Sequence, residues 1–138
     1  MVRSKAELRA TRERVGLSQA KLAEAAGVQV RAVKRWESPK AQQHAPADVW
    51  EYLGEMLKVQ DAIVDHAVQV VEASPATIVR LPHWASQEDY DTHHGGPEGG
   101  YWRTANANAR AVAITLEALG YSVEWVDENP VPLEAWSE

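Results

Sequence analysis

Three cationic side chains, Arg31, Lys34 and Arg35, lie within five positions of one another. Their spacing places them on one face of a helix, because residues three and four apart are neighbours on a helix surface. The arginine fork matches the O6 and N7 acceptors of guanine, and lysine pairs with phosphate oxygens. Lys40 and His44, shortly after this helix, could reach backbone phosphates as well. These residue types and this spacing predict contact with DNA.

A second group of polar residues could hold a metal ion. It comprises His83, Asp89, Asp91, His93 and His94. A zinc site needs three or four converging ligands, usually at fixed short spacings on ordered elements. The two adjacent histidines lie in a glycine-rich stretch without a zinc-binding helix motif, so we interpret the group as a solvated polar loop. The chain has no cysteine, nucleophile motif or phosphate-binding glycine loop, and we predict no enzyme, catalytic residue, metal or cofactor.

Residues 17–37 must position the three cations. Ser18 can cap a first helix over Gln19–Ala26, and Gly27 can adopt the left-handed conformation that ends it. A second helix then covers Val30–Glu37. Four apolar residues fall where two crossing helices would bury them: Leu22, Val28, Val33 and Trp36. Two short helices joined by a tight turn, with cations facing outward, form the arrangement of a helix-turn-helix.

Another helix, over residues 5–15, precedes this pair. Its inner face carries Leu8, Thr11 and Val15. Its basic residues point elsewhere and are expected near the phosphates: Arg9, Arg12 and Arg14. Residues 38–45 are predicted as a loop, because Pro39 disfavours a helical conformation at Ser38.

A long helical pattern begins at Pro46 and continues to about Ala73. Apolar residues recur at spacings of three and four, starting with Val49 and Leu53. About 28 residues would span roughly 40 Å, more than one small domain requires. The helix therefore either breaks near Lys58 or bridges to whatever follows.

The C-terminal half is predicted to contain two strands. Residues 76–81 form the first, which Pro82 closes, and residues 121–126 form the second, with Val123 and Trp125 on one face. A short helical turn after Ser86 and a glycine-rich loop lead to a helix over 101–119. Its inner face is predicted to carry Trp102, Ala105, Ala109, Val112, Ala113, Leu116 and Leu119. Two strands and one helix bury too little apolar surface to be stable on their own. Pairing with a second copy, which would extend the sheet, is therefore favoured.

Charge is distributed unevenly along the chain. Residues 1–40 contain ten Lys or Arg against four Asp or Glu, whereas residues 41–138 contain four against sixteen. Affinity for phosphate depends on local cations, so the net charge of −6 does not oppose DNA binding. No apolar run approaches the roughly 20 residues of a membrane span, and the N-terminus lacks the apolar core of a secretory signal. We expect a cytoplasmic protein.

The spacing of residues 17–37 resembles the Cro/repressor-type (XRE-like) helix-turn-helix family. The shared residues are Leu17, Ser18, Gln19, Leu22, Ala23, Gly27, Trp36 and Glu37. By this resemblance Val30, Arg31, Lys34 and Arg35 occupy the family's base-facing positions, and Val30 could touch a thymine methyl group. Gln19 would either contact a phosphate or brace the recognition helix. Gln29 departs from the pattern, because the family favours Ser or Thr as the cap of this helix.

The whole chain also resembles the YdiL-like family, which includes autorepressors encoded beside anti-CRISPR genes. The matching residues are Arg31, Trp36, Glu37, Ser38, Pro46, Asp48, Val49, Trp102 and Arg103. The resemblance implies a homodimer, held by the C-terminal half, that binds an inverted repeat. The segment around Gly95–Gly100 and the C-terminal tail depart from the shorter members of this family.

Together these observations predict a mainly α protein with a small α+β part. A lambda-repressor-like helix-turn-helix domain with the long helix would occupy residues 1–73, and a two-strand dimerisation domain residues 74–138. The predicted function is a sequence-specific DNA-binding regulator, a homodimeric autorepressor that reads a pseudo-palindromic operator in the major groove. The candidate DNA contacts are Gln19, Gln29, Val30, Arg31, Lys34, Arg35 and Lys40.

Three other functions stay open at this level. An antitoxin would neutralise a partner toxin through its acidic C-terminal half, and it would co-purify with that partner. A ligand sensor would bind an effector in the His- and Trp-rich loop, and the effector would weaken DNA binding. A metal-dependent hydrolase would carry stoichiometric metal when purified.

Overall fold

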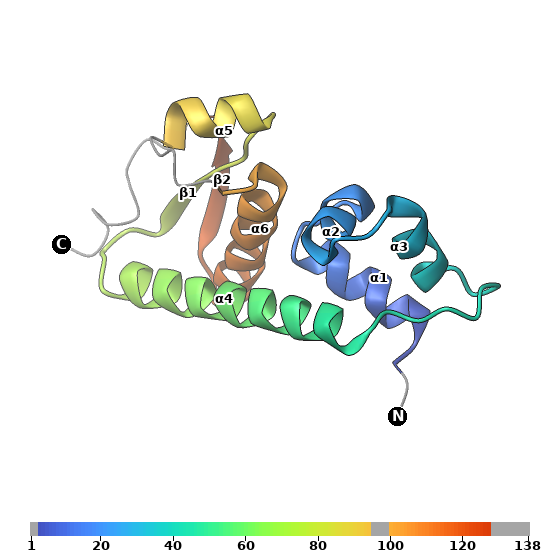
Figure 1. The fold of residues 1–138 in the computed structure, drawn as a ribbon. Coiled ribbons are helices and arrows are strands. Elements are labelled where there is room, and N and C mark those ends of the chain that lie inside the picture. The colour runs from blue at the N-terminus through green and yellow to red at the C-terminus, as the bar shows by residue number, and fades with distance from the viewer. Residues whose placement is uncertain (1–2, 95–99, 128–138) are drawn as a thin grey trace. The chain divides into compact units, whose positions relative to one another are not determined.

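The computed structural model describes residues 3–94 and 100–127 (Figure 1). The chain divides into two compact units, Met1–Val59 and Gln60–Glu138. The division falls inside helix α4 (Ala47–Glu72), which therefore belongs to both units. The sequence analysis divides the chain differently, after residue 73, and that domain boundary stays a prediction.

The N-terminal unit is built from three short helices and the first part of α4. These helices are α1 (Lys5–Arg14), α2 (Gln19–Ala26) and α3 (Val30–Glu37). The Ser18 hydroxyl accepts a hydrogen bond from the backbone N–H of Lys21 at 3.0 Å, which satisfies one of the donors left over at the start of α2. Both predicted helices of the pair therefore form with the predicted ends.

The turn between α2 and α3 depends on Gly27, whose φ is +69°. Its N–H donates to the Glu24 carbonyl, and the next N–H, from Val28, donates to the Ala23 carbonyl. This pair of bonds is a Schellman motif, which needs a left-handed residue at the glycine position. Val28 was predicted to be buried, but it is 37% exposed. It lies in the turn itself, outside both helices, where its side chain does not reach the core.

Apolar side chains from all four helices and from the segment between α1 and α2 form the core of this unit. They are Leu8, Val15, Leu17, Leu22, Ala23, Val33, Trp36, Val49 and Leu53, each no more than 8% exposed. Leu22, Val33 and Trp36 are buried as predicted. The core thus fixes the inner faces of α2 and α3, and it leaves their other faces to solvent.

Helix α4 is continuous over its 26 residues, so it does not break near Lys58. Val49 and Leu53 are buried in the N-terminal unit, whereas Ala67, Val70 and Val71 are buried in the C-terminal unit. One helix therefore supplies apolar surface to two cores. Among the described residues, no helix is long and apolar enough to cross a membrane.

In the C-terminal unit, two parallel strands pair at a register that runs from Ile78 opposite Ser122 to Pro82 opposite Val126. They are β1 (Ile78–Pro82) and β2 (Ser122–Val126). Parallel strands need a long crossover connection, and here it contains α5 (Gln87–His94) and α6 (Trp102–Ala118). The core of this unit joins α4, β1 and α6 through Ala67, Val71, Val79, Leu81, Val112, Ala113 and Leu116.

Several details of this half differ from the sequence prediction. The first strand includes Pro82, which was expected to close it. The adjacent histidines were placed in a loop, but the helical segment α5 extends to His94. Leu119 was assigned to the inner face, yet it is 53% exposed because α6 ends at Ala118 and Leu119 belongs to the cap. Most of the glycine-rich insertion and the tail after Asp127 lie outside the described residues.

Candidate nucleic-acid interface

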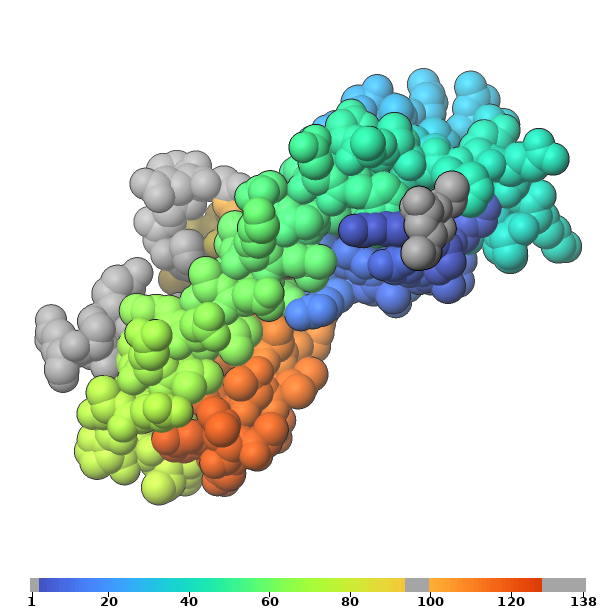
Figure 2. Space-filling model, turned by 90° about the horizontal axis from the view of Figure 1, so that it is seen from below, coloured from blue at the N-terminus to red at the C-terminus, as the bar shows by residue number. Residues whose placement is uncertain are grey.

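Helix α3 presents two different faces. Val33, Trp36 and Glu37 are buried against the rest of the N-terminal unit. The opposite face exposes Gln29, Val30, Arg31, Lys34 and Arg35. Figure 2 shows side chains of the cyan and teal segment, which includes α3 and the loop after it, standing out into solvent. The helix therefore carries a cationic surface on a rigid element.

These cations are not neutralised by neighbouring groups. In the part of the chain that the structure describes, the side chains of Arg31, Lys34 and Arg35 form no hydrogen bond or ion pair. Lys40 is exposed in the loop that follows α3, where its backbone N–H donates to the Ser38 hydroxyl at 3.4 Å. All four charges are thus available to an anionic partner.

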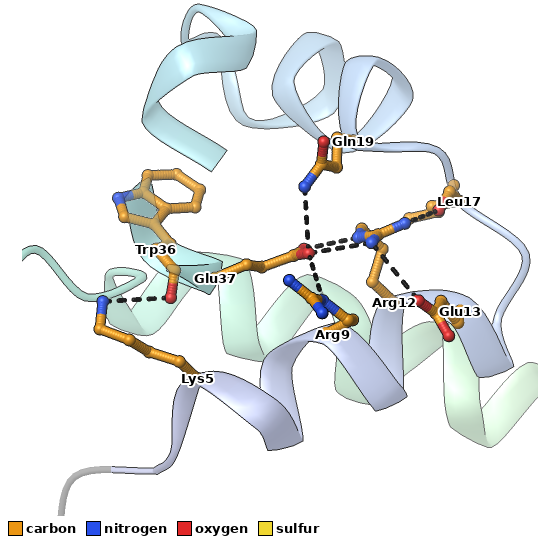
Figure 3. A network of polar contacts seen from close by, with 8 residues as sticks. All are labelled: Lys5, Arg9, Arg12, Glu13, Leu17, Gln19, Trp36 and Glu37. Atoms are coloured by element: carbon orange, nitrogen blue, oxygen red, sulfur yellow. Dashed lines mark hydrogen bonds and ion pairs between the residues drawn. The ribbon is translucent and has the colours of Figure 1, made fainter. Parts of the chain in front are cut away.

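Behind this surface, a buried carboxylate at the end of α3 organises a polar network (Figure 3). The Glu37 side chain is only 1% exposed and receives two hydrogen bonds from the Arg12 guanidinium, at 2.5 and 2.9 Å. Arg12 also donates to the Leu17 carbonyl at 2.8 Å, and Arg9 reaches Glu37 at 3.5 Å. The network therefore ties α3 to α1 and to the start of the α2 segment.

The position of Arg12 corrects the sequence prediction. It was expected to point away from the core, near the phosphates, but its side chain is only 10% exposed. The reason is the ion pair with Glu37, which lies 25 residues further along the chain. A sequence signal existed, because Arg12 follows the buried Leu8 by four residues and precedes the buried Val15 by three. An arginine on that face requires a buried partner.

The protonation of Glu37 reflects these contacts. Burial by itself raises the pKa of a carboxyl group, and it is the largest single influence here. The hydrogen bonds from Arg12 and Gln19, together with the charge of Arg12, outweigh burial and hold the pKa of Glu37 below its ordinary value. Glu37 is therefore ionised at neutral pH, and the ion pair with Arg12 is intact.

For Gln19, the sequence left open whether it contacts a phosphate or braces the recognition helix. Its amide donates to Glu37 Oε1 at 3.2 Å, so in this structure it braces α3 (Figure 3). Its side chain is half-buried, whereas the other six predicted contact residues are exposed. Gln19 thus differs from the rest of the predicted set.

Lys5 makes structural contacts with the end of α3 that were not predicted from the sequence. Its ammonium group donates to the carbonyls of Arg35 and Trp36, at 3.0 and 3.3 Å, and also to the Gln43 carbonyl. The last carbonyls of a helix have no partner within it, so a lysine there satisfies them and favours the negative end of the helix dipole. Lys5 fixes the C-terminal end of α3 to α1.

Within the polar group considered for metal binding, Asp89 and His93 contact each other. His93 Nδ1 lies 3.0 Å from a carboxylate oxygen of Asp89, and its ring stacks on Trp84 with centroids 6.3 Å apart. Among residues 3–94 and 100–127, no group of three or more potential ligands is placed to hold a metal ion.

Comparison with known proteins agrees with this geometry. A family described as a helix-turn-helix domain matches residues 6–67, which include α2, α3 and most of α1 and α4. No curated protein matches the chain. Domains of this kind typically act by binding rather than by catalysis. The match includes α3 with its exposed cationic face, and it supports a helix-turn-helix DNA-binding family.

Proposed function

We propose that this chain is a sequence-specific DNA-binding transcriptional regulator that acts as a homodimeric repressor. The observation that carries the proposal is the exposed cationic face of α3, whose side chains have no ion-pair partner among the described residues and which the buried Arg12–Glu37 pair holds in place. A recognition helix must be rigid, because its side chains meet base edges only if the backbone is fixed. The network behind α3 meets this requirement.

On this proposal, the residues of α3 divide between two tasks. Arg31 and Arg35 read guanine through paired hydrogen bonds, and Val30 contacts a thymine methyl group. Lys34, Gln29 and Lys40 contact the backbone or the adjacent base edges, which positions the helix on the duplex. Gln19 acts through Glu37 and can still approach a phosphate at the start of α2.

A single copy of α3 covers only about half a binding site. Two copies related by a two-fold axis would enter successive major grooves, roughly 34 Å apart, on an inverted repeat. Repression follows if that operator overlaps a promoter, and autorepression follows if the promoter is the protein's own. The XRE-like and YdiL-like resemblances point the same way.

The test starts by selecting bound sequences from random duplexes, followed by titration of the selected site in a gel-shift assay. Arg31→Ala and Arg35→Ala should each cost about 1–3 kcal/mol and relax base preference at one position of each half-site. Arg110→Ala is the matched control, since it removes an exposed arginine from the C-terminal unit. Specific binding that survives both substitutions in α3 would refute the assignment.

A further inference from the structure

In the described residues, neither outer edge of the two-strand sheet pairs with another strand, and the hydrogen bonds between the strands show which groups line each edge. The Ser122 N–H donates to Thr77 and the Val126 carbonyl accepts from His83, both at 3.0 Å. Successive residues of a strand direct their backbone groups to opposite sides, so the N–H and C=O groups of Val123 and Trp125 point away from β1. Within the part of the chain that the structure describes, these four groups have no hydrogen-bond partner.

The outer edge of β1 is less suited to pairing. The same alternation directs the backbone nitrogens of Ile78, Arg80 and Pro82 away from β2. Proline has no N–H, so this edge lacks a donor at Pro82. Proline on an edge strand is a common protection against pairing with another chain. Strand β2 contains no proline, so the two edges differ in their ability to accept a further strand.

Exposed apolar side chains gather on the same part of the chain. Among the described residues of the C-terminal unit, four large apolar residues are exposed, and three of them belong to the α6–β2 segment. These are Ile114, Leu119 and Trp125, at 69%, 53% and 45%. In Figure 2 the orange and red atoms, which belong to the α6–β2 segment, lie at the surface on this side of the molecule. Both the open backbone edge and the apolar surface thus belong to α6 and β2.

We propose that β2 pairs antiparallel with β2 of a second copy of this chain, so that two small sheets form one sheet of four strands. A strand edge is self-complementary about a two-fold axis, because each outward N–H meets an outward carbonyl of the same segment. A two-strand sheet also gains most from such an extension. This inference deepens the homodimer in the proposed function and rests on it.

Charge indicates the register of the pairing. Glu124 lies on the outer face of the sheet, where it pairs with Arg80 at 3.2 Å. A two-fold axis at Glu124 would place two carboxylates directly opposite each other, which is unfavourable. An axis at Val123 instead sets Ser122 opposite Glu124 of the partner subunit and Trp125 opposite Tyr121 of the partner subunit. Because the Tyr121 N–H already donates to the Leu116 carbonyl, both groups of Val123 and the N–H of Trp125 form the hydrogen bonds of this pairing. The second arrangement avoids the repulsion and adds an aromatic pair.

The chain contains no cysteine, so a single introduced cysteine reports directly on the register. Directly opposed residues of an antiparallel pair lie close enough for a disulfide. Full-length Val123→Cys should form a covalent dimer on mild oxidation, and a reductant should reverse it. Glu124→Cys and the β1-edge variant Ile78→Cys should cross-link far less. A dimer that forms equally well through Ile78→Cys would overturn the proposal.

A second pair of variants tests the hydrogen bonds themselves. Val123→Pro removes an outward N–H from β2 without removing any bond between β1 and β2, and we expect a monomer by light scattering. Ile78→Pro makes the same change on the outer edge of β1 and should leave the dimer intact. Circular dichroism shows whether each variant is folded.

The outcomes separate this inference from the proposed function. A native chain that stays monomeric in solution and on DNA would refute the homodimer and this pairing together. A native dimer that survives Val123→Pro and gives no Val123→Cys cross-link would refute the pairing alone. Neither result affects the assignment of DNA contacts to α3, which the Arg31 and Arg35 variants test separately.

Discussion

At the scale of single residues, Glu37 connects helix α3 to α1 and α2. Its carboxylate is buried, and three side chains from α1 and α2 converge on it: Arg9, Arg12 and Gln19. A buried charge is tolerable only when its partners compensate for lost hydration. Loss of the Glu37 charge would leave the nearly buried Arg12 guanidinium with only the exposed Glu13 carboxylate, 3.8 Å away, as a counterion.

We therefore expect Glu37→Gln to lower the free energy of unfolding at pH 7 by about 3 kcal/mol, as measured by urea denaturation. Glu24→Gln is a matched control, because Glu24 is largely exposed and forms only a surface pair with Lys21. Its effect should stay below about 1 kcal/mol. Equal stabilities for the two variants would contradict the role given to Glu37.

The same residue makes stability depend on pH. The folded-state pKa of Glu37 lies below its ordinary value of 4.5, so the folded state favours the ionised form. The stability that results is complete above the unfolded pKa and is lost as pH falls through the lower, folded pKa. The difference in free energy of unfolding between the native protein and Glu37→Gln should therefore be constant near neutral pH. It should become smaller as the pH falls below 4.5.

At the scale of elements, the beginning of α3 is less well capped than the beginning of α2. Ser18 caps α2 through its hydroxyl, whereas the Gln29 side chain makes no capping hydrogen bond. This agrees with the departure of Gln29 from the family pattern, in which Ser or Thr caps this helix. The end of α3 is better held, because Lys5 donates to the carbonyls of Arg35 and Trp36. Helix α3 is thus anchored mainly from its C-terminal end.

A better cap should therefore stabilise the protein. We expect Gln29→Ser to raise the free energy of unfolding by about 1 kcal/mol, since a serine hydroxyl can accept from a free N–H in the first turn. Gln42→Ser, in the exposed loop, controls for the change of side chain and should have little effect. Unchanged stability in Gln29→Ser would mean that water already satisfies those N–H groups.

At the scale of the whole molecule, the division of charge matters more than its sum. The cations of residues 1–40 include the exposed group on α3, whereas residues 41–138 carry most of the carboxylates. Carboxylates repel the negatively charged phosphate backbone, so the acidic residues 41–138 disfavour any orientation in which they face DNA. On the proposed function, the charge distribution helps to decide which face of the molecule binds.

The dependence of DNA affinity on salt concentration measures how many cationic side chains contact phosphates. Lys40→Ala should weaken binding to all DNA sequences alike and reduce the slope of log affinity against log salt by about 1 for each copy bound. Lys58→Ala removes a lysine that pairs with Glu55 on α4 and should leave the slope unchanged. If Lys40→Ala instead altered base preference at constant slope, its contact would be with a base.

Much of the fold and of the candidate site could be predicted from the sequence, because the signals are local. Ser18 and Gly27 determine where α2 begins and ends through bonds to residues three or four positions away. Helical periodicity alone placed Arg31, Lys34 and Arg35 on the outer face, where the structure has them. Local hydrogen bonds and a fixed repeat do not depend on the rest of the chain.

Only the tertiary structure decided the contacts between distant residues. The partner of Arg12 is 25 residues away, and Gln19 turns inward because the buried Glu37 attracts its amide. The parallel pairing of β1 with β2 joins residues more than 40 positions apart, and its register turns the Pro82 nitrogen away from β2. Such pairings depend on packing and on the burial of charge, which the order of neighbouring residues does not specify.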